Sequence, residues 1–356
     1  MSIELLTGSQ AVALGALRAG VNVFCGCHET ALFGALEYVG KRAQQDRLEG
    51  LSVEWLTGER DALEIAGKAA QHGTYALTAI GQHGLCAVFD VLISQSCLGV
   101  SGLALLVADD FDVSDVRQFA QIAKVPLLAP ATVEEAEAMA RAAFELSERY
   151  STPVVLHLTA VVSHAVVAMG DALDERPPTV SSARPRQQLP EPPQPARSQS
   201  QSSQPTALGH ARQDHSLLAK RFKQLSQASS ASPFNHIEQT GRSAAPAHLG
   251  VVASGATWTK LQDAIAQLGY VGVLRLLKIG MPVAFPEKLA LEFMNGLSEV
   301  LVFEEPEPVI ERELLQLVGQ KHLKVNVLGK LSGTVGWTES GSTNTIQQKM
   351  LDFLSA

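Results

Sequence analysis

The first 165 or so residues alternate between short apolar segments and longer segments with helical periodicity. This alternation is typical of strands joined by right-handed helical crossovers. We therefore expect an α/β fold built on a doubly wound parallel sheet. The expected strands are residues 21–24, 51–56, 74–80, 103–107 and 153–159, and the expected helices are residues 10–19, 30–39, 60–71, 85–96, 116–122 and 133–149.

The composition changes near residue 176, where the chain becomes rich in Pro, Gln, Ser and Arg. Such a segment has too few apolar side chains to offset the entropy lost on ordering. We expect one domain over residues 1–170, a low-complexity linker with a short helical segment over 171–247, and a smaller α/β domain over 248–356. Alternation resumes at Leu249 in that last part.

Charge and hydropathy exclude several classes of partner. The formal net charge of −8 argues against nucleic acid or an anionic membrane. No apolar run approaches the length of a membrane span, and no basic region precedes an apolar run at the N-terminus. We therefore expect a cytoplasmic protein whose cysteines are reduced thiols.

Ligands of open parallel sheets bind beyond the carboxyl ends of the strands, so functional residues are expected there. Glu59 directly follows one such end and opens the next helix. Stabilisation by the helix dipole is one explanation for this acid. A functional carboxylate in a strand-end cleft is the other.

A second strand end contains Cys25, Cys27, His28 and Thr30. Cys-x-Cys followed by His suggests a metal, but the spacing of structural zinc sites is absent, and we expect no metal here. Thr30 is placed to begin a helix, where its hydroxyl has a capping role in any case.

The remaining strand ends give weaker signals. The turn Gln82-His83-Gly84 allows a close approach of backbone to ligand, but ordinary βα turns share this pattern. Asp109 and Asp110 suit Mg²⁺ or a solvated turn. The Ser254-Gly255-Ala256 turn has the form of a phosphate cradle without a nucleotide-binding signature, and Glu304 begins an acidic segment typical of helix capping.

Together these segments resemble the large subunit of indolepyruvate ferredoxin oxidoreductase, within the thiamine-diphosphate-dependent 2-oxoacid:ferredoxin oxidoreductases. The similarity covers nearly everything outside the low-complexity segment. The matching stretches are residues 5–17, 53–66, 108–110, 119–126, 143–147, 162–164, 232–235, 249–255, 278–280 and 300–307.

The resemblance implies a pyrimidine-binding domain up to about residue 170 and a transketolase-C-terminal-like domain after residue 248. Glu59 matches the family's glutamate that hydrogen-bonds the cofactor's aminopyrimidine ring and thereby favours removal of the thiazolium C2 proton. Thr30 matches a threonine that faces substrate or reacting cofactor. We expect Gln82, His83 and Gly84 to contact the cofactor, and Cys27 and His28 to face the substrate.

Departures from the family pattern indicate that other subunits supply part of the cofactor site and the electron-transfer clusters. The family segment Tyr-Pro-Gly-Thr-Pro keeps only Thr30, and the loop after Asp110 is shortened. Neither the Gly-Asp-Gly motif of the Mg²⁺-diphosphate site nor a Cys-x₂-Cys-x₂-Cys iron–sulfur motif is present. We expect a diphosphate-binding subunit to supply Mg²⁺, and gamma-type and iron–sulfur subunits to supply the electron-transfer clusters.

The leading hypothesis is therefore a subunit, inactive alone, of an enzyme that oxidatively decarboxylates a 2-oxoacid. The resemblance favours an aryl pyruvate as substrate, coenzyme A as co-substrate and ferredoxin or a similar carrier as acceptor. Two alternatives stay open. One is a subunit of a split, non-oxidative 2-oxoacid decarboxylase, and the other is a degenerate scaffolding or regulatory subunit without cofactor chemistry.

Overall fold

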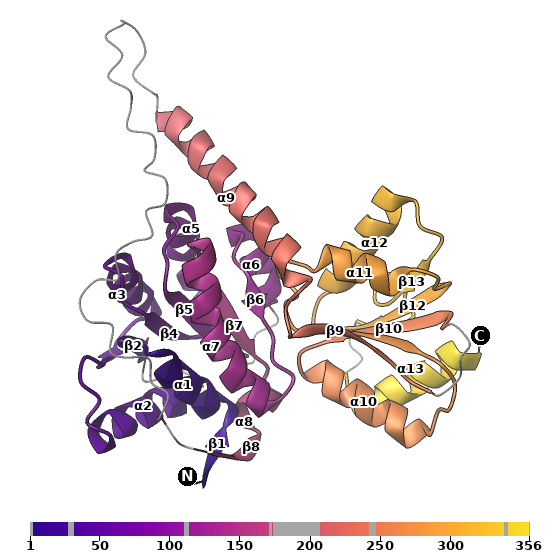
Figure 1. The fold of residues 1–356 in the computed structure, drawn as a ribbon, viewed down its shortest axis with the longest axis horizontal. Helices are drawn as coiled ribbons and strands as arrows, with labels where there is room; N and C mark the ends of the chain where they lie inside the picture. The colour runs from indigo at the N-terminus through magenta and orange to yellow at the C-terminus, as the bar shows by residue number, and fades with distance from the viewer. Residues whose placement is uncertain are drawn as a thin grey trace, which may run out of the picture.

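The computed structural model describes residues 3–27, 32–109, 114–170, 173, 207–241, 247–337 and 341–355. Two α/β units lie next to each other along the long axis of the molecule (Figure 1). The N-terminal unit is built on a sheet of six strands: β2 (Val23–Cys27), β3 (Ser52–Leu56), β4 (Ala76–Gly81), β5 (Leu103–Ala108), β6 (Leu127–Leu128) and β7 (Val154–Leu158).

The strands of this sheet follow the order β3-β2-β4-β5-β7-β6, and all their pairings are parallel. β4 and β5 are buried along their whole length, as expected for strands covered on both faces. The expected doubly wound parallel sheet is thus confirmed.

Helices cover both faces of the six-stranded sheet. Alternate strand residues divide between two apolar clusters, with Phe24 and Leu106 on one face and Cys25 and Leu105 on the other. The first face is covered by α1 (Gly8–Ala19), α2 (Phe33–Gln45) and α7 (Val133–Tyr150), and the second by α3 (Glu59–Gln71), α5 (Phe89–Leu98) and α6 (Val116–Ala123), with the short helices α4 (Gln82–Ala87) and α8 (Ala160–His164) at strand ends.

A two-stranded antiparallel sheet, which the sequence did not predict, flanks this unit. It pairs β1 (Ile3–Thr7) with β8 (Val166–Gly170). Thr7 then begins α1 through a capping box, in which its hydroxyl accepts from the Gln10 amide and the Gln10 side chain accepts from the Thr7 amide.

The C-terminal unit contains a second sheet, in the order β13-β12-β10-β11-β9. Its edge strand β9 is antiparallel to β11 and precedes residue 248, where we expected this unit to begin. Helices again cover both faces. The elements are β9 (Asn235–Gln239), β10 (Leu249–Ser254), α10 (Ala256–Leu268), β11 (Arg275–Ile279), α11 (Glu287–Met294), β12 (Glu299–Phe303), α12 (Val309–Lys321), β13 (Asn326–Leu328) and α13 (Thr343–Ser355).

The two units are joined by direct contacts and by α9 (Ala207–Ser229), which runs from their junction along the N-terminal unit (Figure 1). Arg221 of α9 donates to the carbonyl oxygens of Ser96 and Ser151, on the N-terminal unit. Most of the expected low-complexity linker, residues 171–172 and 174–206, lies outside the described residues.

Backbone and ion-pair contacts close the junction. Leu127 of β6 forms an antiparallel bridge with Val283, and the Ala129 amide donates to the Gly280 carbonyl oxygen at 2.8 Å. The buried Lys278 ammonium pairs with the Glu135 carboxylate. Among the helices of the described residues, none combines the length with the apolar character that a membrane span requires.

Candidate functional site

The N-terminal sheet has its topological switch point between β2 and β4. The chain leaves β2 for β3 on one side and then returns to β4 on the other, so the general rule for such sheets places a ligand crevice, here named the β2–β4 crevice, beyond the carboxyl ends of β2 and β4. Cys27 ends β2, Gly81 ends β4, and Glu59 begins α3 after the adjacent strand β3. Residues far apart in sequence thus converge on one crevice.

The Glu59 carboxyl group lies directly against the α-carbon of Gly84. A β-carbon added to Gly84 would lie 2.8 Å from the Glu59 Oε2 atom and would clash more severely with Oε1 and Cδ. Glu59 opens α3 without a side-chain cap, so its charge also faces the positive end of that helix. A side chain at position 84 would therefore displace this carboxyl group from its present place, and Glu59 itself is only partly buried.

Cys27 is buried beside the same acid. Burial raises the pKa of the Cys27 thiol, and the nearby charges of Glu59 and Asp61 raise it further. Burial, with smaller contributions from Glu54 and Cys27, raises the pKa of Cys25 to about 12. Both environments thus favour the neutral thiol over the thiolate. Among the described residues, no group of three or more His, Cys, Asp or Glu side chains is arranged to hold a metal ion.

Gln82, His83 and Gly84 form the first turn of helix α4 rather than the loop expected from the sequence, and they face different neighbours. Gly84 meets Glu59, but the buried Gln82 side chain donates to the Ser114 carbonyl oxygen on the side of β5. His83 is exposed. The structure therefore brings Glu59, Gly84 and Cys27 together. His28, Thr30 and Asp110 lie outside the described residues.

An aromatic pair that the sequence analysis did not single out lies near this crevice. Phe33 begins α2 and Trp55 lies in β3, with ring centroids 5.2 Å apart. Both rings are partly solvent-exposed. Trp55 lies within β3, four positions before Glu59, and this closeness in sequence to the candidate acid was the available signal.

A buried ionic cluster between the two units was also missed. Arg117 donates to Asp115 at 2.6 Å and to Glu304 at 2.7 Å, and all three side chains are at most 4% exposed. Burial lowers the pKa of Arg117, but the charges of Glu304 and Asp115 outweigh it and the net shift is upward. Glu304 also accepts from the Ile310 and Glu311 amides, which confirms the capping role expected for this acid.

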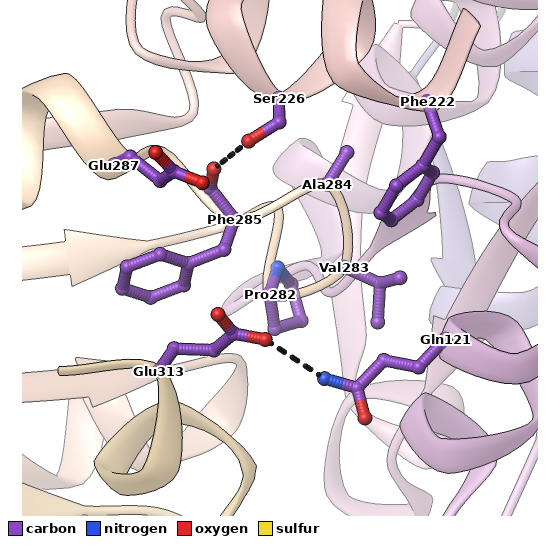
Figure 2. Close-up of a pocket in the computed structure, with 9 residues that line it drawn as sticks. All are labelled: Gln121, Phe222, Ser226, Pro282, Val283, Ala284, Phe285, Glu287 and Glu313. Carbon is purple, nitrogen blue, oxygen red and sulfur yellow. Dashed lines mark hydrogen bonds between the residues drawn. The ribbon is translucent and has the colours of Figure 1, made fainter. Parts of the chain in front are cut away.

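A separate pocket of about 220 Å³ lies where α6, α9, α11 and α12 meet (Figure 2). Glu313 accepts from Gln121 at 3.2 Å across it, and Ser226 donates to the Phe285 carbonyl oxygen at 2.7 Å. Burial and the nearby Glu287 raise the pKa of Glu313. These bonds join the two units, and the pocket is lined by none of the residues of the β2–β4 crevice.

Curated proteins similar to this chain share one description. The chain is 33% identical over 342 residues to the indolepyruvate oxidoreductase subunit IorA of Methanothermobacter thermautotrophicus, a match that covers 93% of this chain and 51% of the relative. The IorA subunit of Thermococcus kodakarensis is 33% identical over 341 residues, covering 92% of this chain and 49% of that protein. The chain is a homologue of the IorA subunits of indolepyruvate oxidoreductases. It spans about half the length of these relatives.

Solved structures show the same fold at lower sequence identity. The 2-oxoglutarate:ferredoxin oxidoreductase from Magnetococcus marinus matches with a TM-score of 0.71 and 14% identity, over 98% of this chain and 65% of that one. A split-gene transketolase, described as an inactive β4 tetramer, matches with a TM-score of 0.59 and 12% identity, over 98% and 96% of the two chains. No protein-family model matches the chain.

Proposed function

We propose that this chain is the cofactor-activating subunit of a multi-subunit 2-oxoacid oxidoreductase that depends on thiamine diphosphate. One observation carries the proposal: the Glu59 carboxyl group lies against Gly84 at the switch point of the first sheet, in a homologue of IorA. The switch point is where ligands of such sheets bind, and a carboxyl group is the chemistry that the cofactor's pyrimidine ring requires.

The described residues of the crevice fit an aminopyrimidine ring. Glu59 would hold the ring through a hydrogen bond from its carboxyl group, and the absence of a side chain at Gly84 would leave room for a flat ring at the backbone. Cys27, a buried neutral thiol, would offer a soft apolar wall. A ring over Glu59 would complete the burial of a carboxyl group that is only partly covered by this chain.

Thiamine diphosphate, when bound, supplies the carbon nucleophile that attacks the carbonyl group of a 2-oxoacid. Glu59 would share a proton with a ring nitrogen through a carboxyl oxygen. We propose that Thr30 faces the reacting groups with His28 and Cys27, and that His83 and Gln82 flank the cofactor.

Other chains would complete the enzyme. We propose that a diphosphate-binding subunit holds the Mg²⁺-diphosphate end, and that gamma-type and iron–sulfur subunits carry electrons to ferredoxin, with coenzyme A accepting the acyl group. The name of the relatives favours an aryl pyruvate as substrate. The exposed Phe33–Trp55 pair offers a nearby aromatic surface that suits such a substrate.

The test is Glu59→Gln in the complex reconstituted with the diphosphate-binding partner, with Glu64→Gln as the matched control. Glu64 lies on the same helix and pairs with Arg60 and Lys68 at the surface. We expect Glu59→Gln to abolish oxoacid-dependent reduction of the acceptor and to weaken thiamine diphosphate binding, and Glu64→Gln to retain both. Full turnover in Glu59→Gln would exclude the mechanism.

The same assay separates the alternative functions. Release of an aldehyde without coenzyme A or an electron acceptor would identify a split decarboxylase. An assembled complex that binds no thiamine diphosphate would identify a scaffolding subunit. The retention of Glu59 against Gly84 favours a subunit that still handles the cofactor.

A further inference from the structure

A cavity of about 300 Å³ lies between the carboxyl ends of the two sheets. Its walls come from the ends of β4, β5 and β7 in one unit and of β10 and β12 in the other. In the second sheet the chain leaves β10 for β11 on one side and later returns to β12 on the other. The cavity therefore lies at the topological switch point of the second sheet, where ligands of such sheets bind.

The wall formed by β10 and α10 presents hydrogen-bond donors without partners. Ser254 and Thr257 line the cavity at 9% and 6% exposure, and neither hydroxyl forms a hydrogen bond to any described residue. Across the cavity, the buried Thr159 hydroxyl likewise has no partner among the described residues. Ser254 and Thr257 open onto the cavity, so their hydroxyls can hydrogen-bond an occupant, and the Thr159 oxygen is a buried polar atom that lacks the usual partner within the described chain.

The N-terminus of α10 faces the same space. It begins after Gly255, whose φ of 53° and ψ of −143° are open essentially to glycine alone, and it has no side-chain cap. Its first amides therefore lack the capping acceptor that a helix N-terminus requires. Because Gly255 has no side chain, an acceptor of another molecule can approach those amides closely.

The acids of the cavity, by contrast, are already paired. Glu304 is held by Arg117 and by two amides of α12. Asp109 lies 2.5 Å from the His157 ring nitrogen. The third acid, Glu305, accepts from the Gly341 amide and lies 3.9 Å from the Lys260 ammonium, which it holds only loosely. The groups that remain to bind an occupant are therefore the hydroxyl groups, the first amides of α10 and the Lys260 ammonium.

We propose that this cavity binds the oxyanion group, a carboxylate or a phosphate, of a small molecule. The oxyanion would accept from the first amides of α10 and from the Ser254 and Thr257 hydroxyls, and the Lys260 ammonium would balance its charge. Neither Glu59 nor Gly84 lines this cavity, but Gln82, which we expect to flank the cofactor, does, so the two sites adjoin each other at the start of α4. Because both units form its walls, an occupant would contact both of them.

The experiment titrates the full chain with inorganic phosphate and, separately, with acetate, at constant ionic strength set by chloride, and follows binding by calorimetry. The double variant Thr257→Val/Lys260→Met removes one hydroxyl and the ammonium while nearly conserving volume. Lys288→Met, at an exposed residue on α11, is the matched control. Thermal unfolding without added anion verifies that each variant is folded.

We expect saturable binding of at least one anion to the wild-type chain and to Lys288→Met. We expect at least a tenfold weaker affinity in the double variant. The anion with the higher affinity identifies the group as phosphate or carboxylate. No saturable binding of either anion, or equal affinity in the folded double variant, would overturn the proposal. Should the double variant not fold, the single variant Lys260→Met decides by the same criteria.

Discussion

Replacing Arg117 by methionine tests the buried ionic cluster between the two units. The substitution keeps an unbranched side chain but removes the cation that Asp115 and Glu304 share. Both carboxylates are at most 2% exposed, so each would be left buried without its main counter-charge. Breaking such a buried pair costs about 3 to 5 kcal/mol of unfolding free energy. Urea unfolding of the full chain, followed by circular dichroism, measures this loss.

The control is Arg312→Met, which removes a half-exposed ion pair with Glu307 at 3.7 Å. We expect it to cost less than about 1 kcal/mol, because exposed pairs contribute little. A loss in Arg117→Met no larger than in this control would show that the cluster is not buried as described.

The pH dependence gives an independent check of the same cluster. Burial raises the pKa of Glu304, and Arg117 opposes that shift. Without Arg117, the folded pKa rises further above the unfolded value, so the folded state binds more protons and stability falls as pH rises through that window. The deficit of Arg117→Met should therefore be larger at about pH 8 than at about pH 5. An equal deficit at both values would refute the assignment.

Two further predictions concern the β2–β4 crevice. Gly84→Ala forces the Glu59 carboxyl group aside. We expect turnover of the reconstituted complex to fall roughly 100-fold, and the unfolding free energy of the chain to fall by only about 1 to 3 kcal/mol. Unchanged turnover would contradict the contact between Glu59 and Gly84. Iodoacetamide at about pH 8 should modify the exposed Cys86 well before the buried Cys25, whose pKa is raised to about 12. Mass spectrometry of timed samples measures the order of modification, and modification of Cys25 first would contradict this prediction.

The sequence predicted the central strands well because apolar runs such as the one before Asp109 need no partner information to be recognised. It missed short edge strands. β1 and β8 have no fully buried face and pair although more than 150 residues separate them in sequence, and β9 is largely polar. Their strand character comes from pairing between distant segments, which local composition does not encode.

The site residues show the same difference between what local sequence indicates and what depends on contacts between distant segments. Glu59 and Gly84 were both identified, since each follows a strand end, but their contact depends on which strands are neighbours in the sheet. Arg117 carried no local signal, because Glu304 lies 187 positions away in the other unit. The Ser254 turn was recognised as a possible anion cradle, whereas its apposition to the first sheet was not predictable from spacing.

The short strand β6 ends the first sheet, and its outer edge is occupied by Val283 from the other unit. The N-terminal unit therefore depends on the C-terminal unit to cover the edge of its sheet. Separating the two units would expose the unpaired backbone N–H and C=O groups of the β6 edge to other molecules. It would also separate Lys278 from its ion-pair partner Glu135. Expression of the two units as separate fragments should consequently give protein that aggregates, although each unit contains its own sheet.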